Sequence, residues 1–238
     1  MLDRFLAPTA DPATVLLLFS HPDDITFAMG GTTRQLADRG HRLHAVVATS
    51  GDKGTYGGLT METLAKRREQ EERDANAVLG VAETTFLGLR DCELQLEPPH
   101  ALRVRLVKTI RRVRPDLLIT HDPASQTQFS MGYHPDHRTL AYAALDSVVF
   151  ARLPNFFPGD LPEPAHRTPH VWTVSFTGAV PVDITVEWEA KVQAIRMHRT
   201  QMEKTPGREA QYIAAFRDRA RDPGTGRLYE RFNCAERF

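Results

Sequence analysis

Histidine and aspartate side chains gather at two copies of one tripeptide. His-Pro-Asp occurs at residues 21–23 and again at 134–136, and Asp24 and His137 extend the two copies. A chain of this composition would contain about 0.045 such tripeptides by chance, so the repetition favours a shared chemical role. Two imidazoles and one carboxylate are ligands of many catalytic zinc ions, which keep a fourth position for water. The candidate ligands of a divalent cation are His21, Asp24, His134 and His137.

The other side chains of the two motifs could supply acid–base chemistry. Asp23 and Asp24 are adjacent and point differently, so one can bind the metal while the other faces the water as a base. Catalytic zinc lowers the pKa of a bound water molecule to about 7, which allows a carboxylate to help deprotonate it near neutral pH. A histidine that does not bind metal could polarise the substrate oxygen, and Asp136 could hold that ring by a hydrogen bond.

A single His-Pro-Asp also has an ordinary structural interpretation, because proline suits the first turn of a helix and aspartate can cap it. Two extended copies, each placed after an expected strand, favour the metal site instead. His121 also ends a strand, and we expect it to act behind the ligands or to close a loop. The remaining histidines have no motif around them and are expected at the surface or in packing contacts: His41, His44, His100, His166, His170 and His198.

Strands and helices alternate along the first part of the chain. Short apolar runs predict strands at residues 15–19, 41–49, 84–87 and 117–120. Helical spacing, with glycine or proline at the ends, predicts helices at residues 34–39, 61–79, 101–113 and 138–150. We interpret the charged run within 61–79 as a solvated helix face. The alternation predicts a parallel sheet that is covered by helices on both faces.

The strand order decides whether the two motifs can meet. In open α/β sheets the ligand crevice lies beyond the carboxyl ends of the strands, where the strand order reverses. A first-half order of 3-2-1-4 makes the first and fourth strands neighbours and brings residues 21–24 and 134–137 together. Further strands are predicted at 171–176 and 182–186, and terminal helices at 188–198 and 209–220. We expect one α/β domain over residues 1–238, a Rossmann-like three-layer sandwich with a mostly parallel sheet and C-terminal elaborations.

The composition excludes several classes of protein. Hydrophobic residues make up 41% and charged residues 25% of the 238 residues, as in a folded globular protein. Lys plus Arg equals Asp plus Glu at 30 each, so no basic excess favours nucleic-acid binding. The apolar run at 15–19 is far shorter than the ~20 residues of a membrane-spanning helix, and it lacks the flanks of an export signal. The two cysteines are too few for a disulfide framework, so we expect a cytoplasmic protein. Because no segment could span a membrane, we expect no membrane partner.

At the two motifs and around them, the sequence resembles the PIG-L/LmbE-type zinc-dependent N-acetylglucosamine deacetylases, a family that also includes thiol-conjugate amidases. The similarity spans most of the chain. It rests on residues 21–24, Gly30-Gly31-Thr32, the turn at 49–54, Leu79-Gly80-Val81, Thr120-His121-Asp122-Pro123 and residues 134–138. Near the end, Lys191 and the pair His198 and Gln201 resemble the C-terminal helix pattern of the family.

The resemblance implies a role for each residue of the two motifs. The ligands of Zn²⁺, or of another divalent metal, would be His21, Asp24 and His137. Asp23 would be the general base. His134 would stabilise the oxyanion, with Asp136 behind it.

Substrate contacts and departures from the family pattern lie outside these motifs. Arg68 and Asp91 fall where relatives contact the sugar. The family usually has an acidic residue one or two positions after the double aspartate, where this chain has Ile25 and Thr26. A carboxylate near the metal would therefore be missing, and the affinity for the metal would differ. A tyrosine often assists near the second motif, and Tyr133 is adjacent to it. The loops at 54–60 and 126–133 would select the substrate.

The expected function is that of a zinc-dependent hydrolase that removes an N-acetyl or other N-acyl group from an amino sugar or its conjugate. Two other classes stay open: a non-catalytic α/β binding module, and a non-haem iron oxygenase with the same two-His-one-Asp ligand set. The module predicts no stoichiometric metal, and the oxygenase predicts iron and oxygen-dependent turnover. The expected partner is a small N-acetylated sugar or conjugate, and the apolar segment at 153–158 favours a homo-oligomer.

Overall fold

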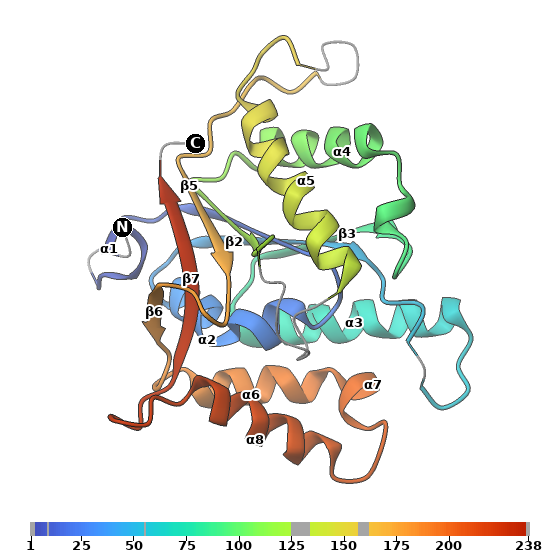
Figure 1. Ribbon diagram of the computed structural model, residues 1–238, viewed down its shortest axis with the longest axis vertical. Helices are drawn as coiled ribbons and strands as arrows, with labels where there is room; N and C mark the ends of the chain where they lie inside the picture. The colour runs from blue at the N-terminus through green and yellow to red at the C-terminus, as the bar shows by residue number, and fades with distance from the viewer. Residues whose placement is uncertain (1–2, 9, 55, 125–133, 157–161, 237–238) are drawn as a thin grey trace.

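A seven-stranded, mostly parallel β-sheet with helices on both faces forms the centre of the protein (Figure 1). The computed structural model describes residues 3–8, 10–54, 56–124, 134–156 and 162–236. The strand order is β3-β2-β1-β4-β5-β7-β6, so the predicted first-half order of 3-2-1-4 is confirmed. The strands are β1 (Thr14–Phe19), β2 (Arg42–Thr49), β3 (Glu83–Leu89), β4 (Leu117–His121), β5 (His170–Val174), β6 (Val180–Asp183) and β7 (Tyr229–Glu236).

Helices cover the sheet in layers. One face carries α4 (Pro99–Val113) and α5 (Pro135–Ala151), and the other carries α2 (Asp24–Asp38) and α3 (Met61–Leu79). The C-terminal helices α6 (Trp188–Met197), α7 (Arg199–Met202) and α8 (Arg208–Ala220) pack outside α2 and α3 as a further layer. The short α1 (Asp3–Leu6) and the 3-10 helix η1 (Leu94–Leu96) complete the set of described helices. Among the described residues, no helix is long and apolar enough to cross a membrane.

The first five strands of the sheet are parallel, and β7 runs antiparallel to both of its neighbours, β5 and β6. The predicted α/β fold with a mostly parallel sheet is therefore confirmed. The C-terminal elaborations are the added antiparallel strands and the outer helical layer.

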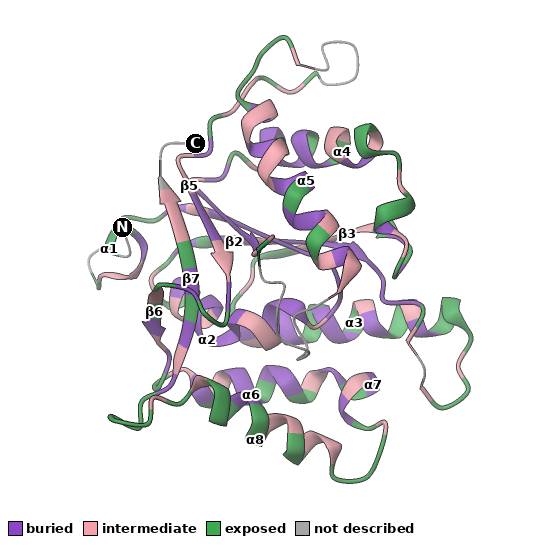
Figure 2. Ribbon diagram, viewed as in Figure 1, coloured by how far each residue is buried: buried purple, intermediate pink, exposed green. Residues whose placement is uncertain are grey.

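The core lies on both faces of the sheet, because successive side chains of a strand point to opposite sides. On β1, Val15 and Leu17 pack toward α2 and α3, whereas Leu16 and Leu18 pack toward α4 and α5. All four side chains are fully buried. Figure 2 shows the same pattern, with buried residues along the strands and on the helix sides that face the sheet. This two-sided burial explains why β1 is an uninterrupted apolar run.

Helix α2 begins ten residues before its predicted start at residue 34 and takes in the glycine-rich stretch. Because glycine lowers helix propensity, the sequence-based prediction left this stretch outside the helix. The structure gives the reason for the glycines, because a Cβ atom on Gly31 would lie 2.6 Å from the Cβ of Ile184. The helix is also kinked at Met29, which has non-helical φ and ψ angles. The close approach of the α2 backbone to Ile184 therefore requires a glycine at position 31.

The charged helix α3 is only partly solvated. Four of its polar side chains are buried: Arg68, Glu71, Glu72 and Asn76. The interpretation of the whole charged run as a solvated face was wrong for these residues. Each of them has a polar partner outside α3, which is the condition under which charges are tolerated inside a protein. Two of these groups, Arg68 and Glu72, hold the first His-Pro-Asp motif.

Candidate active site

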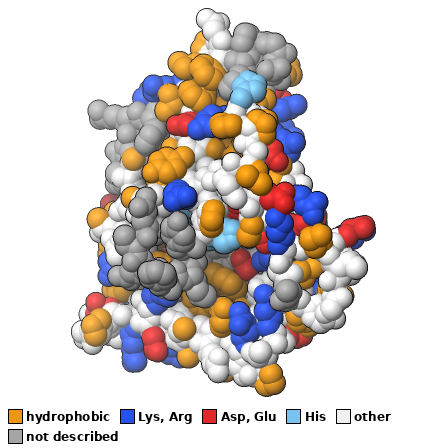
Figure 3. Space-filling model, turned by 45° about the vertical axis from the view of Figure 1, so that its right-hand side comes forward, with side chains coloured by type: hydrophobic (Ala, Val, Ile, Leu, Met, Phe, Trp, Pro, Cys, Tyr) orange, Lys and Arg blue, Asp and Glu red, His pale blue; other side chains and the backbone are white. Residues whose placement is uncertain are grey.

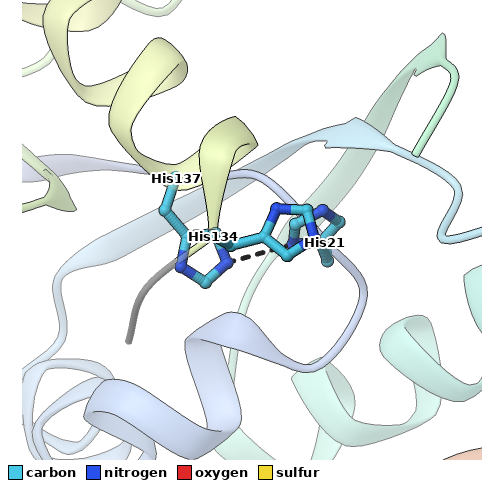
Figure 4. A group of neighbouring side chains, drawn as sticks. All are labelled: His21, His134 and His137. Carbon is cyan, nitrogen blue, oxygen red and sulfur yellow. Dashed lines mark hydrogen bonds between the residues drawn. The ribbon is translucent and has the colours of Figure 1, made fainter. Parts of the chain in front are cut away.

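The carboxyl ends of β1 and β4 bring the two His-Pro-Asp motifs together. The two strands are parallel neighbours in the sheet. The chain leaving β1 enters α2 at Asp24, and α5 begins at Pro135 of the second motif. Figure 4 shows the result, with His21, His134 and His137 drawn beside one another below the first turn of α5. Segments more than a hundred residues apart in the sequence thus form one site.

The donor atoms of His21, Asp24 and His137 converge. Nδ1 of His21 lies 3.1 Å from Nε2 of His137, and the latter atom lies 3.1 Å from Oδ1 of Asp24. Nδ1 of His21 lies 3.4 Å from Oδ2 of Asp24. Two imidazole nitrogens and one carboxylate oxygen at these separations fit a single small divalent cation, with room for a further ligand. The chemistry of the donor set therefore suits zinc.

His121 lies directly behind these donors. Its ring stacks on His137 with centroids 4.0 Å apart, and Nε2 lies 3.3 Å from Oδ2 of Asp24. Together with Asp24 and His137, it forms one of several overlapping sets of possible metal ligands. The backbone N–H of Ser20 donates to Nε2 of His121 at 3.1 Å. The expected role of His121 behind the metal ligands stays a prediction.

Three carboxylates set the charge of His21. Burial alone would lower the pKa of His21, but hydrogen bonds to Asp136, Asp24 and Asp91 raise it well above its usual value. Burial would likewise raise the pKa of Asp24, yet the charges of His137 and His121 hold it well below its usual range. Asp24 is therefore anionic, as a carboxylate that binds a cation must be.

Asp23 has an unusual backbone and a buried carboxylate. Its φ angle is 120°, in a region that residues with a Cβ atom rarely adopt. The guanidinium of Arg68 donates to Oδ2 of Asp23 at 2.9 Å and to the carbonyl oxygens of Pro22 and Gly51 at 2.7 and 3.0 Å. Burial raises the pKa of Asp23 to about 6, although Arg68 opposes the rise. A carboxylate that titrates near neutrality is suited to general base catalysis.

Arg68 lies deeper than a sugar contact would suggest. Its residue exposure is 6%, and its three bonds hold the first motif and the turn after β2 in place. The resemblance gave Arg68 a contact with the sugar, whereas the structure places its guanidinium against the candidate base. The sugar contact that the resemblance implied for Arg68 stays a prediction.

His134 presents a hydrogen-bond donor to the site. Its Nδ1 atom accepts the backbone N–H of Asp136 at 3.2 Å, so a neutral ring carries its proton on Nε2. Burial lowers the pKa of His134, and the positive charges of His21 and His137 lower it further, which favours the neutral ring. The side chain is 29% exposed, more than those of the three candidate ligands, so Nε2 can reach a substrate.

Asp136 supports a different histidine from the one expected. Its Oδ2 atom lies 3.1 Å from Nε2 of His21 but 3.9 Å from Nδ1 of His134, which already accepts a backbone N–H. The expected position of Asp136 behind His134 is therefore corrected to a position behind His21. Backbone N–H groups of Cys92 and Leu94 fix the two oxygens of Asp136 at 2.8 and 3.1 Å.

The loop after β3 places Asp91 and Cys92 beside His21 and His134. Oδ1 of Asp91 lies 3.2 Å from Nε2 of His21, and the backbone N–H of Asp91 donates to Asp52 at 2.9 Å. Sγ of Cys92 lies 3.5 Å from Nε2 of His134. Asp91 was expected near the sugar, whereas Cys92 was missed because an isolated cysteine carries no spacing signal. Its backbone N–H, not its thiol, holds Asp136.

Glu72 was also missed, although it lies against the first motif. Its Oε2 atom accepts the backbone N–H of Asp23 at 2.9 Å, and burial raises its pKa to about 8. Thr26, at a position where an acidic residue was expected, shares a hydrogen bond of 3.1 Å with Nε2 of His198. His198 is buried, in agreement with its expected packing role, and burial lowers its pKa to about 3.

Part of the expected substrate loop lies outside the described residues, namely residues 126–133 with Tyr133, and so does residue 55 in the loop at 54–60. On the face drawn in Figure 3, a histidine side chain lies beside a hollow near the centre, with acidic and basic side chains around it. Tyr56 connects the loop after β2 to the outer helical layer, since its hydroxyl donates to Glu203 at 2.8 Å.

Comparison with known proteins identifies the family. Residues 16–148 match the family model PIG-L, described as GlcNAc-PI de-N-acetylase. The chain belongs to the PIG-L family. Over 202 residues it is 35% identical to a diacetylchitobiose deacetylase of Thermococcus kodakarensis, an alignment that covers 82% of this chain and 72% of the relative.

Two further PIG-L relatives are informative. The structure of N,N'-diacetylchitobiose deacetylase from Pyrococcus horikoshii, in complex with its inhibitor MPG, has a TM-score of 0.85 and 32% identity, and the match covers 98% of this chain and 87% of that one. A probable N-acetyl-alpha-D-glucosaminyl L-malate deacetylase 2 of Bacillus cereus is 32% identical over 144 residues, which cover 59% of this chain and 62% of the relative. These relatives of the PIG-L chain are named as deacetylases of N-acetylated amino sugars.

Proposed function

We propose that this PIG-L protein is a zinc-dependent hydrolase that removes an N-acetyl group from an amino sugar or an amino-sugar conjugate. The observation that carries the proposal is the convergence of His21, Asp24 and His137 within 3.1–3.4 Å, beside a candidate base. Similarity to a diacetylchitobiose deacetylase over 82% of the chain supports an N-acetylated sugar as the substrate.

His21, Asp24 and His137 would hold the metal. A divalent ion at this position would polarise the amide carbonyl and lower the pKa of a water molecule. The remaining steps belong to side chains of the protein. His21 is held in place by Asp136 at 3.1 Å, so its Nδ1 atom keeps its direction toward the other two ligands.

Asp23 acts as the general base in this proposal. Its carboxylate accepts a proton from the attacking water, and the same proton then goes to the nitrogen of the leaving amine. The guanidinium of Arg68, 2.9 Å away, keeps enough Asp23 ionised for the first of these transfers. Because the side chain is only 13% exposed and is bonded to Arg68, its orientation is fixed before substrate binds.

His134 stabilises the negative charge that develops on the amide oxygen. Its Nε2–H group is available because Nδ1 already accepts the backbone N–H of Asp136. A preorganised donor of this kind commonly contributes 10²–10³ in rate, or about 3–4 kcal/mol. Asp91, whose side chain is 10% exposed beside His21, is the proposed contact for a sugar hydroxyl.

Elemental analysis combined with amine release tests the proposal. Purified protein should contain about one zinc per chain. It should also release a primary amine from at least one of diacetylchitobiose, N-acetylglucosamine and N-acetylglucosaminyl malate. Protein without a stoichiometric metal and without turnover would instead indicate a binding module. Iron together with oxygen-dependent turnover would indicate an oxygenase.

A further inference from the structure

Asp23 occupies a strained backbone conformation that its surroundings must maintain. Its φ and ψ angles are 120° and −24°, at the position just before helix α2. A residue with a Cβ atom is strained in such a region and stays there only where neighbouring groups hold it. The peptide N–H of Asp23 is directed away from α2 toward Glu72 of helix α3.

Glu72 is built to receive this N–H group. The residue is fully buried, and its Oε2 atom accepts the N–H of Asp23 at 2.9 Å. The side-chain amide of Asn76 donates to the other oxygen, Oε1, at 3.0 Å and lies 3.1 Å from the hydroxyl of Thr84 on β3. The carboxyl group is therefore anchored to the sheet, and its orientation is fixed.

The placement of Glu72 is costly for the fold alone. A carboxyl group loses its hydration when it is buried, and the nearby carboxylates of Asp23 and Asp24 oppose its ionisation. An apolar side chain would fill the same space between α3 and the sheet without this penalty. What an apolar side chain could not do is accept the N–H of Asp23.

Arg68 and Glu72 act on Asp23 from one helix face. They are four residues apart on α3, so both side chains point the same way. Arg68 holds the carboxylate of Asp23 and the carbonyl of Pro22, whereas Glu72 holds the backbone N–H between them. These contacts fix both the peptide plane and the side chain of the candidate base.

We propose that Glu72 is a positioning residue that keeps the Asp23 carboxylate aimed at the attacking water. The inference rests on the proposed deacetylase function, because the aim of Asp23 matters only if Asp23 takes a proton. Glu72 does not touch substrate, so its loss reduces kcat and leaves KM nearly unchanged. A misplacement of about 1 Å can cost about 10²-fold in rate.

Three variants of Glu72 test the proposal. We expect Glu72→Ala to lower kcat by about 10²-fold with KM within about threefold and with zinc content unchanged. Glu72→Leu keeps most of the side-chain volume but removes the acceptor, and we expect kcat to fall as in Glu72→Ala. In Glu72→Gln the carbonyl oxygen can still accept the Asp23 N–H, and Asn76 can turn its unpaired Oδ1 toward the new N–H₂ group, so we expect this variant to keep most of kcat.

Glu62→Gln is the matched control, because Glu62 is an exposed carboxylate of the same helix, paired with Lys66. A folded, zinc-loaded Glu72→Ala protein with kcat within about twofold of wild type would overturn the proposal. So would a folded Glu72→Gln protein as slow as Glu72→Ala. If Glu72→Ala fails to fold, Glu72→Leu and Glu72→Gln decide the question.

The geometry can also be tested without turnover. If wild-type protein releases no amine from any sugar, the deacetylase proposal fails, but crystals of Glu72→Leu and Glu72→Gln still report on Asp23. We expect the φ angle of Asp23 to leave the positive region in Glu72→Leu and to stay there in Glu72→Gln. An unchanged φ angle in Glu72→Leu would overturn the inference.

Discussion

Nδ1 of His134 accepts a hydrogen bond from the backbone N–H of Asp136, two residues further along the chain, at 3.2 Å. This contact at the start of α5 serves as a helix cap and also fixes the tautomer of the ring. The proton of neutral His134 is therefore on Nε2, the atom that faces the site. A structural cap and the proposed donor to the oxyanion are thus the same imidazole.

Replacement of His134 tests this donor. We expect His134→Ala to lower kcat for amine release by about 10²–10³-fold, because a donor to the developing oxyanion is lost. Zinc content should stay at the wild-type level, since His134 is not one of the proposed ligands. His100→Ala, at an exposed position, is the control. Loss of zinc from His134→Ala would instead make His134 a ligand.

Removal of the base should separate metal binding from turnover. We expect Asp23→Ala to retain zinc and to lose at least about 10²-fold in kcat, because general acid–base groups contribute 10²–10⁴-fold. Elemental analysis and initial rates at saturating substrate measure the two effects. Turnover equal to that of wild type would remove Asp23 from the mechanism.

The pH dependence of activity should follow Asp23. Burial raises its pKa to about 6 in the metal-free protein, and a bound cation would lower it from there, so kcat/KM falls with decreasing pH at or below about 6. Arg68 favours the ionised form, so Arg68→Met should raise the pKa and move the acid limb to higher pH. Arg67→Met, an exposed neighbour, should leave the limb in place. A shift of the limb to lower pH in Arg68→Met would contradict this electrostatic role.

Zinc should stabilise the folded protein through the same three ligands. A ligand that binds only the native state at 100 times its Kd adds about 2.7 kcal/mol to the free energy of unfolding. We therefore expect chelation to lower the Tm of the wild type and added zinc to restore it. His137→Ala should lose this zinc-dependent shift, whereas His166→Ala should keep it. Equal shifts in all three proteins would place the metal elsewhere.

The glycines of α2 should differ in their tolerance of a methyl group. In Gly31→Ala the new Cβ would lie 2.6 Å from Ile184, a buried side chain, and overpacking costs about 1–3 kcal/mol. In Gly30→Ala it would lie 3.2 Å from Cγ of Lys191, a contact that is 0.6 Å longer, so we expect a smaller loss. Urea unfolding measures both free energies. A larger loss for Gly30→Ala would refute the assignment of close packing to Gly31.

Much of the fold could be predicted from local patterns. The apolar run of β1 and the helix–strand alternation indicated the parallel sheet, and the position of each motif after a strand indicated where the motifs meet. Strand β7 was missed, because its inward position 230 is a glutamate and breaks the apolar alternation. The structure explains this exception, since Glu230 pairs with Lys191 at 2.6 Å and accepts the N–H groups of Gly31 and Thr32.

In the site too, residues within a local sequence motif could be predicted, whereas residues that depend on a distant contact could not. His21, Asp24 and His137 were found from the repeated tripeptide, and the structure brings them together. Glu72 was not found, because a charged residue at helical spacing looks the same on a solvated face as on a buried one. Glu72 is recognised only by its hydrogen bond to the N–H of Asp23, which lies 49 residues away in the chain.

The position of β7 has a consequence for how the protein is made. Strand β6 precedes β7 in the chain, yet among the described residues its ladder partner is β7, which lies between β5 and β6. During translation, the ribosome therefore delivers β6 well before anything can pair with it. The half containing β1 to β5 can begin to fold at that stage, as nascent proteins commonly do from the N-terminus. A nascent chain stalled before residue 229 would leave β6 and the amide groups of Gly31 and Thr32 without their partners in β7, and chaperones would have to protect it.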